Sequence, residues 1–223
     1  MTQNQVKEII YSLQRYYPRA YEQVLSEAAL FVCSFTLEPV LHSRFATWLA
    51  VIVLLAADLA AALLFQTTND RFLAVNNLVL IVLIVGITNL WAQSGMKARD
   101  IALFGGLLAV YDVVATSRLS LTTEMVVRLA GLPFAPLFAW GSGSTACGLG
   151  LGDVLLATVF PLVMRKAFGR SAGMLALVLA LAAIGTLLAL PLPGAFPVMV
   201  VLGPLMVLQY LFWHRRCGRE RTT

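Results

Sequence analysis

The chain has 223 residues, of which 60% are hydrophobic and only 12% are charged. That share of charge is about half of the usual share in a soluble domain, and repeated apolar segments of about 20 residues have the length of a membrane-crossing helix. The composition disfavours a soluble protein with several core helices and predicts an all-α, polytopic membrane protein. The net charge of +5 does not indicate nucleic-acid binding, because the basic residues lie in short loops between apolar runs.

Cysteine and histidine are sparse. Cys33, Cys147 and Cys217 have neither paired nor metal-ligand spacing, and the two histidines, His42 and His214, lie near predicted membrane borders. This usage disfavours a disulfide framework, a histidine-based metal site and a histidine-containing catalytic triad. We therefore expect no metal and no cofactor.

The N-terminal segment, residues 1–44, is expected to lie at the membrane interface. Within residues 1–24, apolar side chains recur at helical spacing, which predicts an amphipathic surface helix, with a plain soluble extension as the alternative. Its polar beginning does not suggest a secretory signal peptide. The following apolar stretch, Ala28 to Leu41, is short for a span and is interpreted as re-entrant or interfacial.

Residues 45–213 form the predicted transmembrane domain, and residues 214–223 form a basic cytoplasmic tail. Six spans are expected, at Phe45–Phe65, Phe72–Trp91, Ile101–Ser117, Leu149–Met164, Ala172–Leu190 and Gly194–Trp213. The third and fourth spans are joined by a long connection, residues 118–147. Its apolar middle is broken by glycine and proline, and we expect it to follow the membrane or to pack beside the third span.

The distribution of lysine and arginine predicts the orientation. With six spans, 13 of the 16 basic residues fall on one side of the membrane, and only Arg71, Arg118 and Arg128 fall on the other. Because basic residues concentrate on the cytoplasmic side, both termini are expected to be cytoplasmic. Counting Ala28 to Leu41 as a seventh span weakens this bias, so six spans are preferred.

Two acids lie inside the predicted spans. Asp112 is about five residues before the outer end of the third span, and Asp153 is about five residues after the outer start of the fourth. At a rise of 1.5 Å per residue, both lie about 7–8 Å below the same border. Ionisable groups at membrane depth are costly and usually functional. Because the third and fourth spans are antiparallel neighbours and the two acids lie at the same depth, we expect their carboxyl groups to form a pair.

Such a pair supports hydrolysis. Two carboxyls held about 3 Å apart share one proton, so the ionised member can deprotonate a water while the other donates to the scissile carbonyl. Which aspartate plays which role is left open, because the pair titrates as a unit. Gly148, Gly150 and Gly152 allow close approach of helices and substrate, and the Tyr111 phenol can donate a hydrogen bond.

The two acids stand in motifs that resemble those of a known family. The motifs are Tyr111-Asp112 within an apolar helix and Gly150-Leu151-Gly152-Asp153 at the opening of the next. They are similar to the YD and GxGD motifs of intramembrane aspartyl proteases, the presenilin and signal peptide peptidase group, and the likeness spans roughly residues 105–170. The resemblance implies that Asp112 and Asp153 are catalytic and that the neighbouring Tyr111, Gly150 and Gly152 contact substrate.

The family's third motif, Pro-Ala-Leu, has an altered counterpart before the last span. The corresponding residues are Pro193, Gly194, Ala195, Phe196 and Pro197. Ala195 matches the family's alanine, Phe196 stands where leucine is usual, and Gly194 replaces the first proline. The resemblance implies a substrate-binding segment, and a purely structural kink is the alternative.

Family members typically have nine spans, whereas this chain offers six, which would correspond to the last six. The predicted orientation matches signal peptide peptidase rather than presenilin. The resemblance therefore implies type II transmembrane segments or leftover signal peptides as substrates, in a prokaryotic plasma membrane or an endomembrane. The oligomeric state is left open.

Two other functions fit the same residues. A proton-coupled transporter or channel also uses buried acids and broken helices. A prepilin-peptidase-type GxGD protease is a further alternative, but it cuts at the cytoplasmic border, whereas Asp153 is expected near the outer one. A third acid, Asp58, lies in the first span, where it can line a water path or pair with an asparagine of the second span.

Overall fold

Six helices and one pair of short strands make up the part of the chain that the structure describes. This computed structural model describes residues 29, 32, 44–65, 70–118, 137–140, 147–189 and 197–220. The helices are α2 (Arg44–Phe65), α3 (Asp70–Gln93), α4 (Ala98–Arg118), α6 (Leu151–Phe168), α7 (Arg170–Ala189) and α8 (Met199–Cys217). The strands are β1 (Leu137–Trp140) and β2 (Cys147–Gly150).

Each of the six expected spans corresponds to one of these helices, so the all-α prediction is confirmed for the main elements. Long runs rich in alanine and leucine fold as helices because both residues favour the helix and because their apolar side chains pack against neighbouring helices. Most boundaries agree to within four residues, and two helices begin later than expected. Helix α6 begins at Leu151 rather than Leu149, because Leu149 and Gly150 belong to β2, and α8 begins at Met199 rather than Gly194.

Two helices contain segments that are long and apolar enough to cross a membrane. These segments are Ala74–Gln93 in α3 and Arg170–Leu187 in α7, and α2 contains a shorter apolar segment, Trp48–Leu64. The expected interfacial segments, residues 1–24 and nearly all of Ala28 to Leu41, lie outside the described residues.

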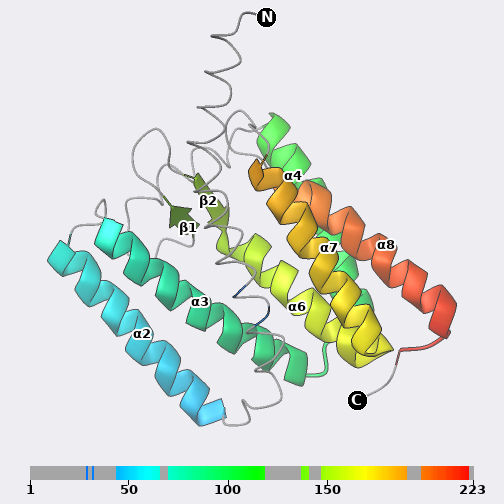
Figure 1. Cartoon of the computed structure of the whole chain (residues 1–223), viewed down its shortest axis with the longest axis horizontal. Coiled ribbons are helices and arrows are strands. Elements are labelled where there is room, and N and C mark those ends of the chain that lie inside the picture. The colour runs from blue at the N-terminus through cyan, green and yellow to red at the C-terminus, as the bar shows by residue number, and fades with distance from the viewer. Residues whose placement is uncertain are drawn as a thin grey trace, which may run out of the picture.

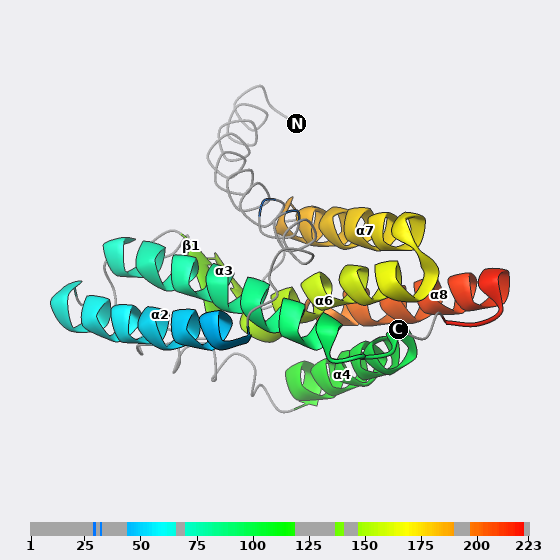
Figure 2. The same cartoon turned by 90° about the horizontal axis from the view of Figure 1, so that it is seen from below.

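The helices lie side by side with their axes roughly aligned, and helices consecutive in sequence run in opposite directions (Figures 1 and 2). Helix α6 occupies the centre, in contact with α3, α4, α7 and α8. Accordingly, 12 of its 18 residues are buried. Several of the fully enclosed side chains of the core, among them Val154, Phe160 and Met164, belong to this helix. The structure therefore places the predicted GxGD aspartate on the best-packed helix of the bundle.

Helices α4 and α8 pack closely because glycines face each other along their contact. A Cβ atom on Gly203 would clash with the backbone carbonyl oxygen of Gly105 and would stand 2.7 Å from the Cβ of Ala109. A Cβ atom on Gly105 would stand 2.9 Å from the sulfur of Met206. Small residues allow helix backbones to approach in this way where no hydrophobic force drives association. The main partner of α4 is thus α8, and its contact with α6 is smaller.

The strand pair was not predicted. In the antiparallel pair, Leu137 lies opposite Gly150 and Trp140 lies opposite Cys147. Strand β1 contacts α3, so the described part of the connection packs on the second expected span rather than chiefly beside the third. The buried side chain of Phe138 anchors β1 in the core. The pair holds the polypeptide extended up to the first residue of α6.

The basic tail also differs from the expectation. Helix α8 continues to Cys217, so His214, Arg215 and Arg216 lie in its last turn rather than in a separate tail. After Gly218, which has a positive φ of 76°, the chain turns back, and the Glu220 carboxylate accepts a hydrogen bond from the backbone N–H of Arg99. This contact fastens the end of α8 to the start of α4.

Candidate active site

Asp153 lies in the first turn of α6, directly after β2. Gly150 is the residue that caps this helix, and its backbone is extended, with φ −63° and ψ 137°. A Cβ atom at Gly150 would stand 3.1 Å from Oδ2 of Asp153, so the carboxylate folds back over the glycine. A larger residue at position 150 would crowd the acid. The first glycine of the GxGD motif therefore makes room for the aspartate that ends it.

Asp112 lies six residues before the end of α4, on the face that meets α8. Gly105, Ala109 and Asp112 recur at the i, i+4, i+7 spacing of one helix face, and the first two contact Gly203. The same face brings Asp112 to the start of α8, where its carboxylate accepts a hydrogen bond from the backbone N–H of Met199. This N–H is one of the amides that a helix leaves unsatisfied at its N-terminus, so Asp112 caps α8 from another helix.

The two aspartates lie at the same end of the bundle. The end of α4, the start of α6 and the start of α8 come together there, because α4 runs opposite to the other two helices (Figure 1). Both carboxylates are half-buried, and they are near enough to interact electrostatically. Asp112 and Asp153 therefore share one end of the bundle (Figure 1), and Asp153 lies nearer the start of its helix than the sequence suggested.

Two interacting carboxyl groups with partial access to solvent form an acid–base site. One carboxyl can bind a water while the other carries the proton that a leaving group or a carbonyl oxygen requires. In the described part of the chain, histidine, cysteine, aspartate and glutamate do not gather in groups of three or more that would hold a metal ion. Two neighbouring carboxyl groups support proton transfer and activation of water.

The predicted substrate-contacting residues fall into three groups. Gly152 is exposed, and a Cβ atom built there meets nothing within 4 Å among the described residues other than its chain neighbours and its own helix backbone. Tyr111 is 61% exposed and lies on the outer surface of α4. Pro197 is half-buried just before α8, whereas Pro193, Gly194, Ala195 and Phe196 lie outside the described residues.

Two features of the site carry no sequence signal of the usual kind. The backbone N–H of Met199 contacts Asp112, and a backbone donor leaves no side-chain motif to find. Strand β2 provides an extended segment next to Asp153, and within the described residues it is paired with β1 along one side. The alternation of glycine and leucine before Asp153 is the only sequence hint of that strand.

The third acid lies apart in sequence and on a different helix. Asp58 of α2 is fully buried, although the residues on both sides of it are exposed. Helix α2 packs on α3, whose Asn76 is also buried. Asp58 is thus buried on a helix that packs against the second expected span, and the two expectations for it, a water path or a contact with an asparagine, stay predictions.

A basic residue of α6 serves the opposite end of the bundle. The ammonium group of Lys166 donates a hydrogen bond to the backbone carbonyl of Ala92, at 2.7 Å. This carbonyl lies in the last turn of α3, where a helix has unsatisfied acceptors and a partial negative charge. Lys166 therefore fixes α6 to α3 at the end remote from the two acids.

Comparisons of the chain with protein families, with curated proteins and with solved structures found no match. The functional argument therefore rests on the residues and their geometry.

Proposed function

We propose that the chain is an intramembrane aspartyl protease that hydrolyses peptide bonds within type II or signal-peptide-like transmembrane segments. The observation that carries the proposal is that Asp112, near the end of α4, and Asp153, in the first turn of α6, lie at the same end of the bundle (Figure 1), and that α4 and α6 are in contact. A proton relay needs acids in series, whereas hydrolysis by a water that a pair of carboxyl groups activates needs both acids at one place.

The proposal includes a membrane domain of six spans, with both termini cytoplasmic. Large apolar side chains on the surface of the bundle support it. On α2, Leu63 and Leu64 are 80% and 76% exposed, and on α4, Leu107 and Val110 are 69% and 64% exposed. Soluble monomers rarely expose contiguous apolar surface of this kind, whereas lipid-facing helices do so as a rule.

In the proposed reaction the two acids share one proton at the start. The ionised carboxylate removes a proton from water, and the resulting hydroxide adds to the scissile carbonyl carbon while the other carboxyl protonates the carbonyl oxygen. The tetrahedral intermediate then collapses with cleavage of the C–N bond, and the amine leaves with a proton from the pair. The products are a new carboxylate and a new amine, and the acid pair returns to its starting state.

Access to a transmembrane substrate requires local unwinding, because a helix hides its own peptide bonds. Gly152, exposed and without a side chain, leaves room for a backbone beside Asp153. Strand β2, which ends at Gly150, supplies a template for pairing with an extended segment. Together these features favour a substrate that is extended at the cleavage point.

The proposal is tested by cleavage. Full-length protein purified in detergent is incubated with a type II transmembrane peptide in water enriched in ¹⁸O, and the fragments are identified by mass spectrometry. The expected result is one cut within the apolar segment, with one ¹⁸O atom in the new carboxyl terminus. A matched preparation of Asp153→Asn controls for contaminating proteases. An intact substrate panel in the presence of folded protein would refute the proposal.

A proton-coupled transporter or channel is the second candidate, and the fully buried Asp58 favours it. A transporter requires a protonatable group inside the bundle, and Asp58 on α2 supplies one outside the α4–α6 pair. Uptake into vesicles driven by a proton gradient, abolished by Asp58→Asn and without any cleavage, would decide for this function.

A further inference from the structure

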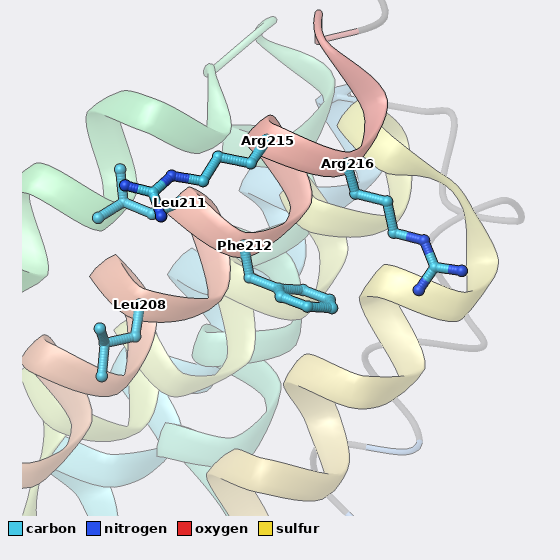
Figure 3. Close-up of a pocket in the computed structure, with 5 residues that line it drawn as sticks. All are labelled: Leu208, Leu211, Phe212, Arg215 and Arg216. Carbon is cyan, nitrogen blue, oxygen red and sulfur yellow. The ribbon is translucent and has the colours of Figure 1, made fainter.

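The outward face of α8 near its end combines an apolar stripe with two arginines. Leu208, Leu211, Phe212 and Arg215 follow the i, i+3, i+4, i+7 spacing of one helix face. With Arg216, they line an open pocket of about 530 Å³ (Figure 3). Leu208, Leu211 and Phe212 are each 42–64% exposed. The pocket therefore has an apolar floor and a cationic end.

The two arginines bracket the aromatic ring at that end. Figure 3 shows the Arg215 side chain extending over Leu211 and the Arg216 side chain extending to the other side of Phe212. The Arg216 guanidinium lies 5.7 Å from the ring centroid of Trp213, which steadies it by a cation–π contact. In the part of the chain that the structure describes, neither guanidinium forms an ion pair with a carboxylate.

We propose that this pocket binds one anionic phospholipid, with its phosphate at Arg215 and Arg216 and an acyl chain along Leu208, Leu211 and Phe212. The argument is one of complementarity along the helix axis. A soluble anion would satisfy the arginines but would not cover the apolar stripe. A zwitterionic lipid would cover the stripe, but its own ammonium group would offset the charge of its phosphate, whereas a lipid with net negative charge neutralises the arginines. Only an amphiphile with a negative headgroup matches both parts.

The position of the pocket agrees with this occupant. The arginines lie in the last turn of α8, at the end predicted to face the cytoplasm, where anionic headgroups accumulate. Trp213 and Phe212 supply the aromatic rings that favour the membrane interface. The lipid site rests on the membrane orientation that the proposed function includes, but not on proteolysis, since none of its residues belongs to the Asp112 and Asp153 site.

The test measures lipid binding to the full-length protein in a neutral detergent. Phosphatidylglycerol or phosphatidylcholine is titrated in, and bound lipid is counted by native mass spectrometry. We expect one phosphatidylglycerol to bind at low concentration and phosphatidylcholine to bind at least tenfold more weakly. An arginine near anionic lipid contributes about fivefold to affinity, so the double variant Arg215→Gln/Arg216→Gln should bind phosphatidylglycerol about 25-fold more weakly.

Two controls keep the result specific. Arg219→Gln removes an exposed arginine near the same helix end but outside the pocket, and it should change the affinity by less than twofold. Phe212→Ser keeps both arginines and should also weaken binding, because the acyl chain loses its contact.

Three results would overturn the proposal. One is equal retention of both lipids by the wild-type protein. Another is displacement of phosphatidylglycerol by millimolar inorganic phosphate, which would show a site for a soluble anion. The third is a dimer that forms through Phe212 and excludes lipid, detected by cysteine crosslinking at that position.

Discussion

Replacing Gly203 with alanine should force α4 and α8 apart and displace Asp112. The added Cβ would collide with the backbone carbonyl of Gly105 and approach the Cβ of Ala109 to 2.7 Å, and backbone cannot rotate away as a side chain can. Overpacking costs about 1–3 kcal/mol, whereas Gly→Ala in a helix gains at most about 1 kcal/mol, so the clash outweighs the gain in helix propensity. We expect a net loss of about 1–2 kcal/mol in the free energy of unfolding.

The loss appears as a fall of about 2–8 °C in Tm, measured by thermal unfolding in detergent. Activity should fall further, because the hydrogen bond from Met199 to Asp112 spans the same helix pair, and a displacement of about 1 Å in a catalytic group costs on the order of 10²-fold. Gly106→Ala is the matched control, since its Cβ meets only the Val207 side chain, at 3.1 Å. A Gly203→Ala protein as stable and active as wild type would refute the close packing of α4 against α8.

Three further substitutions are expected to change Tm in different directions. Gly152→Ala should keep or slightly raise Tm, because no described residue other than its chain neighbours and its own helix backbone lies within 4 Å of the added Cβ. The same change should lower the cleavage rate, because the methyl group crowds the substrate. An unchanged cleavage rate would show that Gly152 does not contact the substrate. Lys166→Met should lower the free energy of unfolding by about 1–3 kcal/mol, because the hydrogen bond to the carbonyl of Ala92 is lost. Arg170→Met, at an exposed position, should leave the free energy of unfolding unchanged. Equal Tm values for the two variants would contradict a stabilising role of Lys166. Gln209→Met should leave Tm unchanged or raise it, because the buried Oε1 of Gln209 has no hydrogen-bond partner in the described part of the chain. A fall of several degrees in Tm would indicate that Oε1 has a partner.

The helices could be predicted because their signal is local. An apolar run of fixed length becomes a helix wherever it is packed or immersed in lipid, so Phe45–Phe65 was found to within one residue as α2. Errors arose where the chain outside the run decides the boundary. Leu149 and Gly150 look like the opening of α6, but pairing with Leu137–Trp140 draws them into a strand. Glycine has little preference for strands, so no local rule reveals this pairing.

The sequence predicted the two acids of the candidate site but not the packing of the helices that hold them. The motifs around Asp112 and Asp153 gave both side chains and their common end of the bundle. They did not show that α4 packs chiefly on α8, because that choice depends on Gly105 and Gly203 meeting across two distant segments. The donor to Asp112 is a backbone amide, which has no counterpart in sequence patterns.

The central claim is that Asp112 and Asp153 act as one unit, and the cleavage rates of Asp112→Asn, Asp153→Asn and the double variant test it most directly. Asparagine keeps an acceptor oxygen for the Met199 amide, so the fold should persist, and equal Tm values would verify this. We predict that each single variant loses at least 10²- to 10⁴-fold in rate and that the double variant loses no more than either one. A single variant with full activity, or losses that multiply in the double variant, would contradict the account.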